Sequence, residues 1–273
     1  MSDTYLSRED YEEPTCPLCA PSSVEPIPTS RVIEKLDDYL GHNDYAAAER
    51  HLTYWLESAR AGRDQRGELT VLNEQIGLFR KLGREPEGLR AIEQALALAR
   101  DLGMEQTVTF GTTLVNAATG YKAFGKPDRA LALYEQARAL YESNLKPDDS
   151  RLGGLYNNMA LALVDLGDYR RAEALYRQAM DVMAKQEHGE AEMAITCCNL
   201  ADLVAAEQGT VEGEAAIRAY LEQAEALLDT ESLPKNGYYA FVCEKCAPTF
   251  TYYGFFLTRK ELEQRARHIY EGT

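Results

Sequence analysis

The sequence predicts an all-α protein in which pairs of antiparallel helices stack side by side into a solenoid. The first observation is a repeat, because six glycines are separated by 42, 42, 42, 42 and 45 residues. They are Gly41, Gly83, Gly125, Gly167, Gly209 and Gly254. The second observation is that each glycine lies between two segments whose apolar residues recur with the period of a helix. Since neither helix of such a pair can bury its apolar face alone, neighbouring pairs must pack on one another.

One helix pair is expected for each glycine. The six pairs are expected near residues 31–61, 67–101, 106–144, 149–187, 190–229 and 238–271. We expect them to form one continuous solenoid over residues 31–273. Two pairs depart from the pattern. The segment EQGTVEGEAA lengthens the turn of the fifth pair by about three residues. Pro248 is expected to kink the first helix of the sixth pair or to delay its start.

Small residues flank these turns, where the two helices of a pair are expected to come closest. They are Ala118, Ala130 and Ala137 in the third pair, Ala160, Ala172 and Ala179 in the fourth, and Ala247 and Ala266 in the sixth. Large side chains such as Tyr134 and Tyr176 are expected to fill the spaces between them.

The segment LGDYRRAEALYRQAM, residues 166–180, resembles the tetratricopeptide repeat in its turn residues and in its spacing of alanine and tyrosine. The 42-residue period, with asparagine on the first helix, is similar to the longer variant found in kinesin light chains. The resemblance covers roughly residues 31–271. It implies a right-handed α-solenoid of about six repeats, whose first helices line a concave face that binds a peptide or protein segment.

Asparagines recur on the first helices. Asn116, Asn158 and Asn199 are spaced 42 and 41 residues apart, and Asn73 and Asn157 lie one place earlier in their repeats. An asparagine amide offers both a donor and an acceptor, so a ladder of them suits the backbone of an extended peptide. The family resemblance implies the same role. The alternative is that each asparagine ties one helix to its neighbour.

Other first-helix positions in this register also carry polar or charged side chains. They are Arg80, Thr112, Thr119, Lys122 and Asp202. Arg80 and Lys122 occupy equivalent places in successive repeats and would suit a carboxylate or phosphate on a ligand. The alternative is that they are solvated charges at the edge of the groove.

Residues 1–30 differ from the rest of the chain. They contain five of the ten prolines and six acidic residues against one arginine. We expect an extended, acidic arm that is long enough to lie along part of the groove as a built-in competitor. The arm contains the pair CPLC, formed by Cys16 and Cys19.

A second Cys-x-x-Cys pair, Cys243 and Cys246, lies in the sixth repeat. Two such pairs could supply the four thiolates of a zinc site that staples the arm to the last repeat. A redox-active or disulfide-forming pair is a second interpretation, and separate roles with buried packing are a third. Cys197 and Cys198 are adjacent on a helix, so we expect one in the core and Cys198 near the groove.

Aromatic residues crowd into residues 238–256. They are Tyr238, Tyr239, Phe241, Phe250, Tyr252, Tyr253, Phe255 and Phe256. A terminal repeat normally has a polar outer face, so we expect this one to be covered by the arm, by a second subunit in a homodimer, or by a partner protein.

The net charge and the lack of catalytic motifs in the sequence indicate the class of function. A net charge of −15 disfavours nucleic acid and anionic membranes as partners. The N-terminus lacks the apolar core of a secretory signal, so a cytoplasmic location is expected. No phosphate-binding loop, nucleophile elbow or zinc-protease motif occurs. The sequence therefore predicts a non-enzymatic scaffold that binds a peptide or protein, with a zinc- or peptide-responsive regulatory protein as the alternative.

Overall fold

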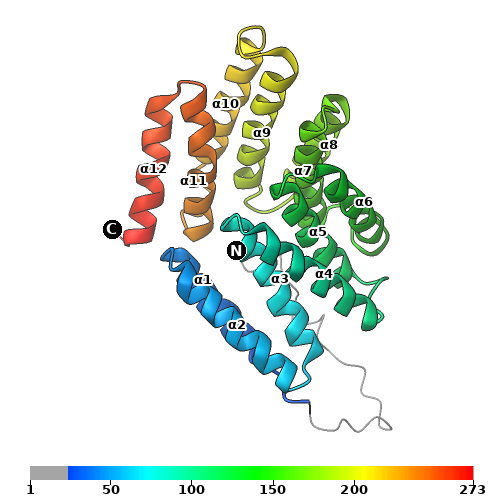
Figure 1. Cartoon of the computed structure of the whole chain (residues 1–273). Helices are drawn as coiled ribbons and strands as arrows, with labels where there is room; N and C mark the ends of the chain where they lie inside the picture. The colour runs from blue at the N-terminus through cyan, green and yellow to red at the C-terminus, as the bar shows by residue number, and fades with distance from the viewer. Residues whose placement is uncertain (1–23, 273) are drawn as a thin grey trace. The chain divides into compact units, whose positions relative to one another are not determined.

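The computed structural model describes residues 24–272, and within them it contains helices and no strands. The chain divides into two compact units at residues 144 and 145, and each unit holds three helix pairs (Figure 1). The first unit contains α1 (Thr29–Gly41), α2 (Tyr45–Ala61), α3 (Gln65–Lys81), α4 (Glu85–Asp101), α5 (Val108–Ala123) and α6 (Pro127–Asn144). The second contains α7 (Ser150–Asp165), α8 (Tyr169–Met183), α9 (Glu190–Gln208), α10 (Glu214–Leu228), α11 (Gly237–Tyr252) and α12 (Phe256–Glu271). The six predicted pairs are confirmed, whereas one continuous solenoid stays a prediction.

The turns within pairs are built as the glycine register predicts. Gly83, Gly125, Gly167 and Gly254 have φ of +65°, +70°, +76° and +83°, a left-handed conformation that glycine adopts without a Cβ clash. Gly41 is different, because it is the last residue of α1 and Asn43, with φ of +56°, takes the left-handed position instead. Asparagine is one of the few other residues that tolerate it.

The helices begin at residues whose side chains accept a bond from the backbone. Asp44, Asp64, Thr107, Asp149, Asp168 and Asn236 each accept from an N–H of the first turn that follows. Such caps satisfy donors that have no partner inside the helix.

The core forms where the small residues were expected. All eight alanines named above are buried, with exposed fractions of 0–3%. Tyr134 and Tyr176 are fully buried between them. First helices of neighbouring pairs also pack on one another. In the first unit α3 packs on α5, and in the second unit α9 packs on both α7 and α11. The first helices therefore lie next to one another within a unit.

The two irregular repeats differ from expectation. The turn between α9 and α10, residues 209–213, is longer than the three-residue turns at 82–84 and 124–126, as predicted. The expectation for Pro248 was wrong in one respect, because α11 starts at Gly237 and runs through the proline without a delay. Pro248 lies on the exposed side of the helix, so its ring and missing N–H disturb no packed contact.

The segment before α1 is fixed to the turn between α2 and α3. The backbone N–H of Glu25 donates to the carbonyl of Gly62 at 2.9 Å. The two carboxylate oxygens of Asp64 are divided, one accepting from the N–H of Gly67 and the other from the N–H of Ile27, both at 2.9 Å. The rest of the predicted arm, including Cys16 and Cys19, lies outside the described residues.

The aromatic residues of the sixth repeat are mostly covered within their own unit. Tyr239 and Phe250 are fully buried in a core cluster with α9 and α10, and Tyr238, Phe241, Tyr253 and Phe255 pack against it. Exposure is confined to Tyr252 and Phe256, at 73% and 63%. The expected need for a cover is therefore much smaller than the sequence suggested.

Among the helices of residues 24–272, none combines the length and the apolar character that spanning a membrane requires.

Candidate functional site

A buried asparagine joins the two central first helices of the first unit. Asn73 on α3 donates from its side-chain amide to the hydroxyl of Thr113 on α5 at 3.2 Å. Its side-chain carbonyl accepts from the amide of Asn116, also on α5, at 2.9 Å. A second amide bond, to the carbonyl of Leu69, keeps Asn73 in place at 3.0 Å. Because Asn73 is 4% exposed, its role is to hold α3 and α5 in register.

The second unit repeats this arrangement. Asn157 on α7 donates to the hydroxyl of Thr196 on α9 at 2.7 Å and accepts from the amide of Asn199 at 3.4 Å. Asn157 is 6% exposed. The bonds join residues 39 to 43 positions apart in both units, one repeat along the chain. Asn73 and Asn157 thus follow the alternative interpretation, in which an asparagine bonds one helix to its neighbour.

The three asparagines of the predicted ladder keep hydrogen-bonding capacity. Asn116, Asn158 and Asn199 are all partly exposed. Asn116 and Asn199 donate to the buried asparagines, but within residues 24–272 their side-chain carbonyls accept no bond. The side chain of Asn158 has no hydrogen-bond partner among these residues. In the second unit, the neighbouring helices α7 and α9 therefore each present an asparagine amide with a free acceptor.

Of the charged and hydroxylic candidates of the first unit, Thr119 and Thr112 are each bonded to a buried tyrosine. The hydroxyl of Thr119 lies 2.9 Å from that of Tyr134 and donates to the carbonyl of Val115 at 2.8 Å. Burial raises the pKa of Tyr134, while the bond to Thr119 and the charge of Arg80 act in the opposite direction. Arg80 is exposed and Lys122 is partly buried. Thr112 lies deeper, bonded to the hydroxyl of Tyr141 at 2.9 Å.

Asp202 is the exposed acidic candidate of the second unit. Its carboxylate accepts a bond from the hydroxyl of Tyr253, the residue that follows α11, at 2.9 Å. Tyr176, the counterpart of Tyr134, is different, because its buried hydroxyl has no hydrogen-bond partner among the described residues. Burial and the charges of Asp202 and Asp165 raise the pKa of Tyr176.

Comparisons with known proteins agree with this repeat geometry. Models of the tetratricopeptide repeat match residues 67–143 and 153–191. The chain contains tetratricopeptide repeats. Proteins built from stacked repeats use extended concave surfaces to bind their partners, and tetratricopeptide repeats generally mediate protein–protein interaction. Among curated proteins, none matches the sequence.

Two solved structures of TPR-like repeats have a similar fold, and a third structure gives a weaker match. Nearly identical TPR-like repeats assigned to a kinesin light chain of Podosopora anserina are 18% identical, with a TM-score of 0.51 over 72% of this chain and 92% of that one. A single-residue variant of the same repeats gives a TM-score of 0.52 at the same identity and coverage. BtubC (BKLC) from P. vanneervenii is also 18% identical, with a TM-score of 0.49 over 90% of this chain and 92% of that one.

The cysteines of the last two tetratricopeptide repeats are all buried. Cys197 and Cys198 on α9 and Cys243 and Cys246 on α11 belong to one core cluster. The neighbouring thiol of Cys246, together with burial, raises the pKa of Cys198. Burial raises the pKa of Cys197 to about 12 and that of Cys243 to about 11. Cys198 lies in the core at 4% exposed, so its expected place near the groove was wrong.

No group of three or more metal-binding side chains occurs within residues 24–272. Since Cys16 and Cys19 lie outside that range, the zinc site with Cys243 and Cys246 stays a prediction. The burial of these two thiols fits the third interpretation, in which they pack in the core of the terminal repeat.

Two functional residues were missed by the sequence reasoning. Thr113 and Thr196 receive the amides of the buried asparagines, and each stands three residues before the asparagine that completes the network, Asn116 or Asn199. This T-x-x-N spacing in the third and fifth tetratricopeptide repeats places both side chains on one helix face. It is the signal that would have found them.

Proposed function

We propose that this protein is a non-catalytic interaction module that binds an extended peptide or protein segment across its first helices. In the second unit the segment would lie over α7 and α9, with Asn158 and Asn199 bonded to its backbone. Such contacts recognise the peptide backbone and leave sequence preference to the neighbouring side chains.

The observation that supports this proposal is the difference between Asn157 and Asn158. The first is buried and fixes the spacing of α7 and α9, whereas the second is partly exposed and has no partner within the described chain. Asn157 fixes the register of the helices, which leaves the amide of Asn158 and the side-chain carbonyl of Asn199 available for a ligand. The conformation of the site is then set before the ligand arrives, which lowers the entropic cost of binding.

The charged side chains on the same helices as the asparagines suggest which ligand charge each unit prefers. Exposed Asp202 lies one helical turn after Asn199 and would attract a basic side chain of the ligand. In the first unit, Arg80 and Lys122 occupy equivalent places near Asn116 and would attract a carboxylate. Each unit is proposed to contribute its own subsite.

A peptide-display selection against the full chain tests the proposal. The pool selected on the wild-type protein is then bound to the double variant Asn158→Ala/Asn199→Ala and to the control Gln178→Ala. Gln178 carries the same amide group but is exposed on the second helix α8. We expect the selected peptides to bind the control as they bind the wild type and to lose binding to the double variant. Equal retention on both would refute a site at these asparagines.

A further inference from the structure

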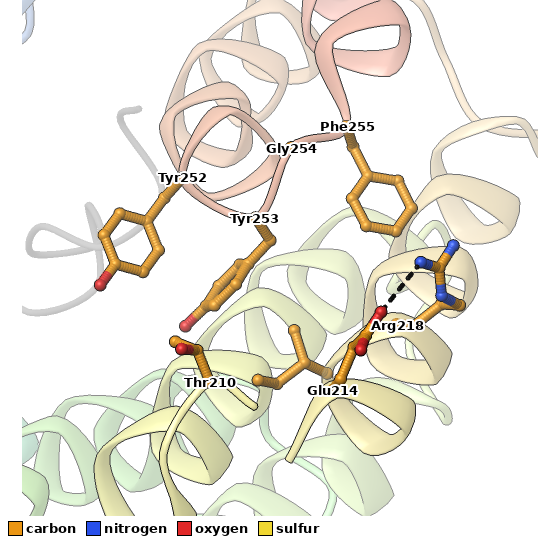
Figure 2. Close-up of a pocket in the computed structure, with 8 residues that line it drawn as sticks. Thr210, Glu214, Arg218, Tyr252, Tyr253, Gly254 and Phe255 are labelled. Atoms are coloured by element: carbon orange, nitrogen blue, oxygen red, sulfur yellow. Dashed lines mark hydrogen bonds and ion pairs between the residues drawn. The ribbon is translucent and has the colours of Figure 1, made fainter. Parts of the chain in front are cut away.

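A cleft of about 440 Å³ lies away from the asparagine ladder, at the turns of the last two repeats. Its walls come from the turn between α9 and α10 and from the turn between α11 and α12 (Figure 2). It is lined by Thr210, Glu214, Ile217, Arg218, Tyr252, Tyr253, Gly254 and Phe255. Because all of these residues belong to the second unit, the cleft is complete within it.

The cleft is walled by three aromatic rings. The rings of Tyr252 and Tyr253 are 4.9 Å apart and perpendicular, at 89°, so together they form a corner. Phe255 follows on the other side of Gly254 (Figure 2). The hydroxyl of Tyr253 donates to the carboxylate of Asp202 at 2.9 Å. A phenol that donates to a carboxylate has a more electron-rich ring, and the face of such a ring attracts cations.

One cation already occupies an aromatic face in this cleft. The guanidinium of Arg218 lies over the ring of Phe255 at 5.6 Å and forms an ion pair with Glu214 at 3.5 Å. No described cation lies over the ring of Tyr252 or Tyr253. In this cleft the ring of Phe255 is therefore already in contact with a cation. The rings of Tyr252 and Tyr253 are aromatic surfaces of the same kind with no described cation on them.

The charge around the corner is negative. Arg218 is the one basic residue of the lining, and Glu214 is its partner. Glu212 in the turn that supplies Thr210 and Glu207 at the end of α9 are both exposed, and Asp202 accepts a bond from Tyr253. An anion entering the cleft would meet this excess of carboxylates, whereas a cation would be attracted by it.

Exposed apolar side chains surround the cleft. Val211, in the first turn, and Tyr252, Phe256 and Leu257, which flank the second turn at the end of α11 and the start of α12, are 78%, 73%, 63% and 80% exposed. Four large apolar residues together at one edge are typical of a surface that a partner protein covers. Such a partner would bring a polypeptide side chain, not a free ion, to the aromatic corner.

We propose that this cleft is a second interaction site, which receives an arginine or lysine side chain of a partner protein against the rings of Tyr252 and Tyr253. The apolar residues around the cleft pack on the partner's neighbouring side chains. The cleft is lined by residues other than the asparagines, and Asp202, which bonds to Tyr253, is the residue that the two proposed sites share.

Capped arginine, N-acetyl-arginine methylamide, is the probe that tests the proposal, and capped citrulline is its neutral control of nearly the same shape. Both are titrated into the full chain while the backbone amide resonances of Thr210 and Gly254 are followed by NMR. We expect capped arginine to shift both resonances in a saturable way and capped citrulline to leave them in place. Absence of a saturable shift, or equal shifts with both probes, would overturn the proposal.

Two variants locate the binding. Tyr252→Leu keeps an apolar side chain at an exposed position and should weaken the capped arginine interaction roughly two- to fivefold, the range expected for one exposed cation–π contact. Tyr54→Leu is the matched control, because Tyr54 is 61% exposed on α2 in the other unit and should leave the interaction unchanged. If Tyr252→Leu binds as tightly as the wild type, the aromatic corner is not the site.

Discussion

Asn157 and Asn158 are consecutive residues of α7, but only Asn157 is buried, where its amide donates to the hydroxyl of Thr196 at 2.7 Å. Replacing Asn157 with alanine leaves Thr196 and the amide of Asn199 without their buried partner. We expect Asn157→Ala to lower the free energy of unfolding by about 1–3 kcal/mol. Asn158→Ala should change it by less than about 0.5 kcal/mol. Urea unfolding of the two variants checks this, and equal losses would contradict the division of roles.

A second pair of variants compares the two buried tyrosines. Tyr134→Phe removes the bond to the hydroxyl of Thr119 and should cost about 1 kcal/mol. Tyr176→Phe removes a buried hydroxyl that has no partner among the described residues, so it should be neutral or stabilising. Thermal unfolding measured side by side shows the difference. A larger loss for Tyr176→Phe than for Tyr134→Phe would mean that the hydroxyl of Tyr176 is bonded in solution.

The carboxyl of Glu74 predicts a pH dependence of stability. Burial, with the nearby charge of Asp37, raises its pKa from 4.5 to about 8. The folded protein therefore holds a proton that the unfolded chain has released. Stability is full below pH 4.5 and is lost as the pH rises through about 8, by up to a few kcal/mol.

Glu74→Gln tests this directly, because a neutral amide of similar size does not ionise. The variant should be more stable than the wild type at pH 8 and should show a flatter profile of unfolding free energy between pH 5 and 9. Glu57→Gln, exposed on α2, is the control and should follow the wild type. Parallel profiles for all three proteins would show that Glu74 is not buried as described.

The four buried cysteines should react slowly with thiol reagents. The raised pKa of Cys197, Cys198 and Cys243 keeps these thiols protonated at neutral pH, and burial hinders access. We expect Ellman's reagent to modify them in the folded protein at least tenfold more slowly than in urea, the thiolate being the reactive form. Mass spectrometry of partly reacted protein identifies which residues are modified. Fast reaction at Cys198 or Cys246 in native buffer would contradict their burial.

The zinc prediction has a separate test. If Cys16, Cys19, Cys243 and Cys246 bind one ion, purified protein contains about one zinc per chain, and Cys243→Ser removes it. Elemental analysis of wild type and variant measures this, with Cys197→Ser as the control. Metal-free wild-type protein that remains folded would leave packing as the role of Cys243 and Cys246.

The fold could be read from the sequence because its signals are local and repeated. The glycine register placed the turn positions, since five of the six glycines adopt a positive φ that other residues avoid. Gly41 failed as a turn marker because Asn43, two residues later, can adopt the same conformation. Pro248 does not delay the start of α11, because it lies on the exposed side of the helix, and that side is set by packing.

The candidate site was only partly predictable. Spacing identified the asparagines but could not separate Asn157 from Asn158, since adjacent residues of a helix point about 100° apart and only the packing of α7 on α9 decides which is buried. The contact of Cys198 with Cys246 joins two repeats, and no motif within one repeat marks it. The aromatic cluster was correctly seen as unusual, yet its partition into a buried core and an exposed cleft depends on α10 and α12.

The affinity of one selected peptide for Asn158→Ala tests the central claim most directly. Isothermal titration is carried out with the wild type, Asn158→Ala and Gln178→Ala, all confirmed to be folded. Loss of one hydrogen bond to the peptide backbone should weaken binding of the asparagine variant roughly three- to tenfold, while the glutamine control binds as the wild type does. Equal dissociation constants for the wild type and Asn158→Ala would contradict a peptide site on the first helices.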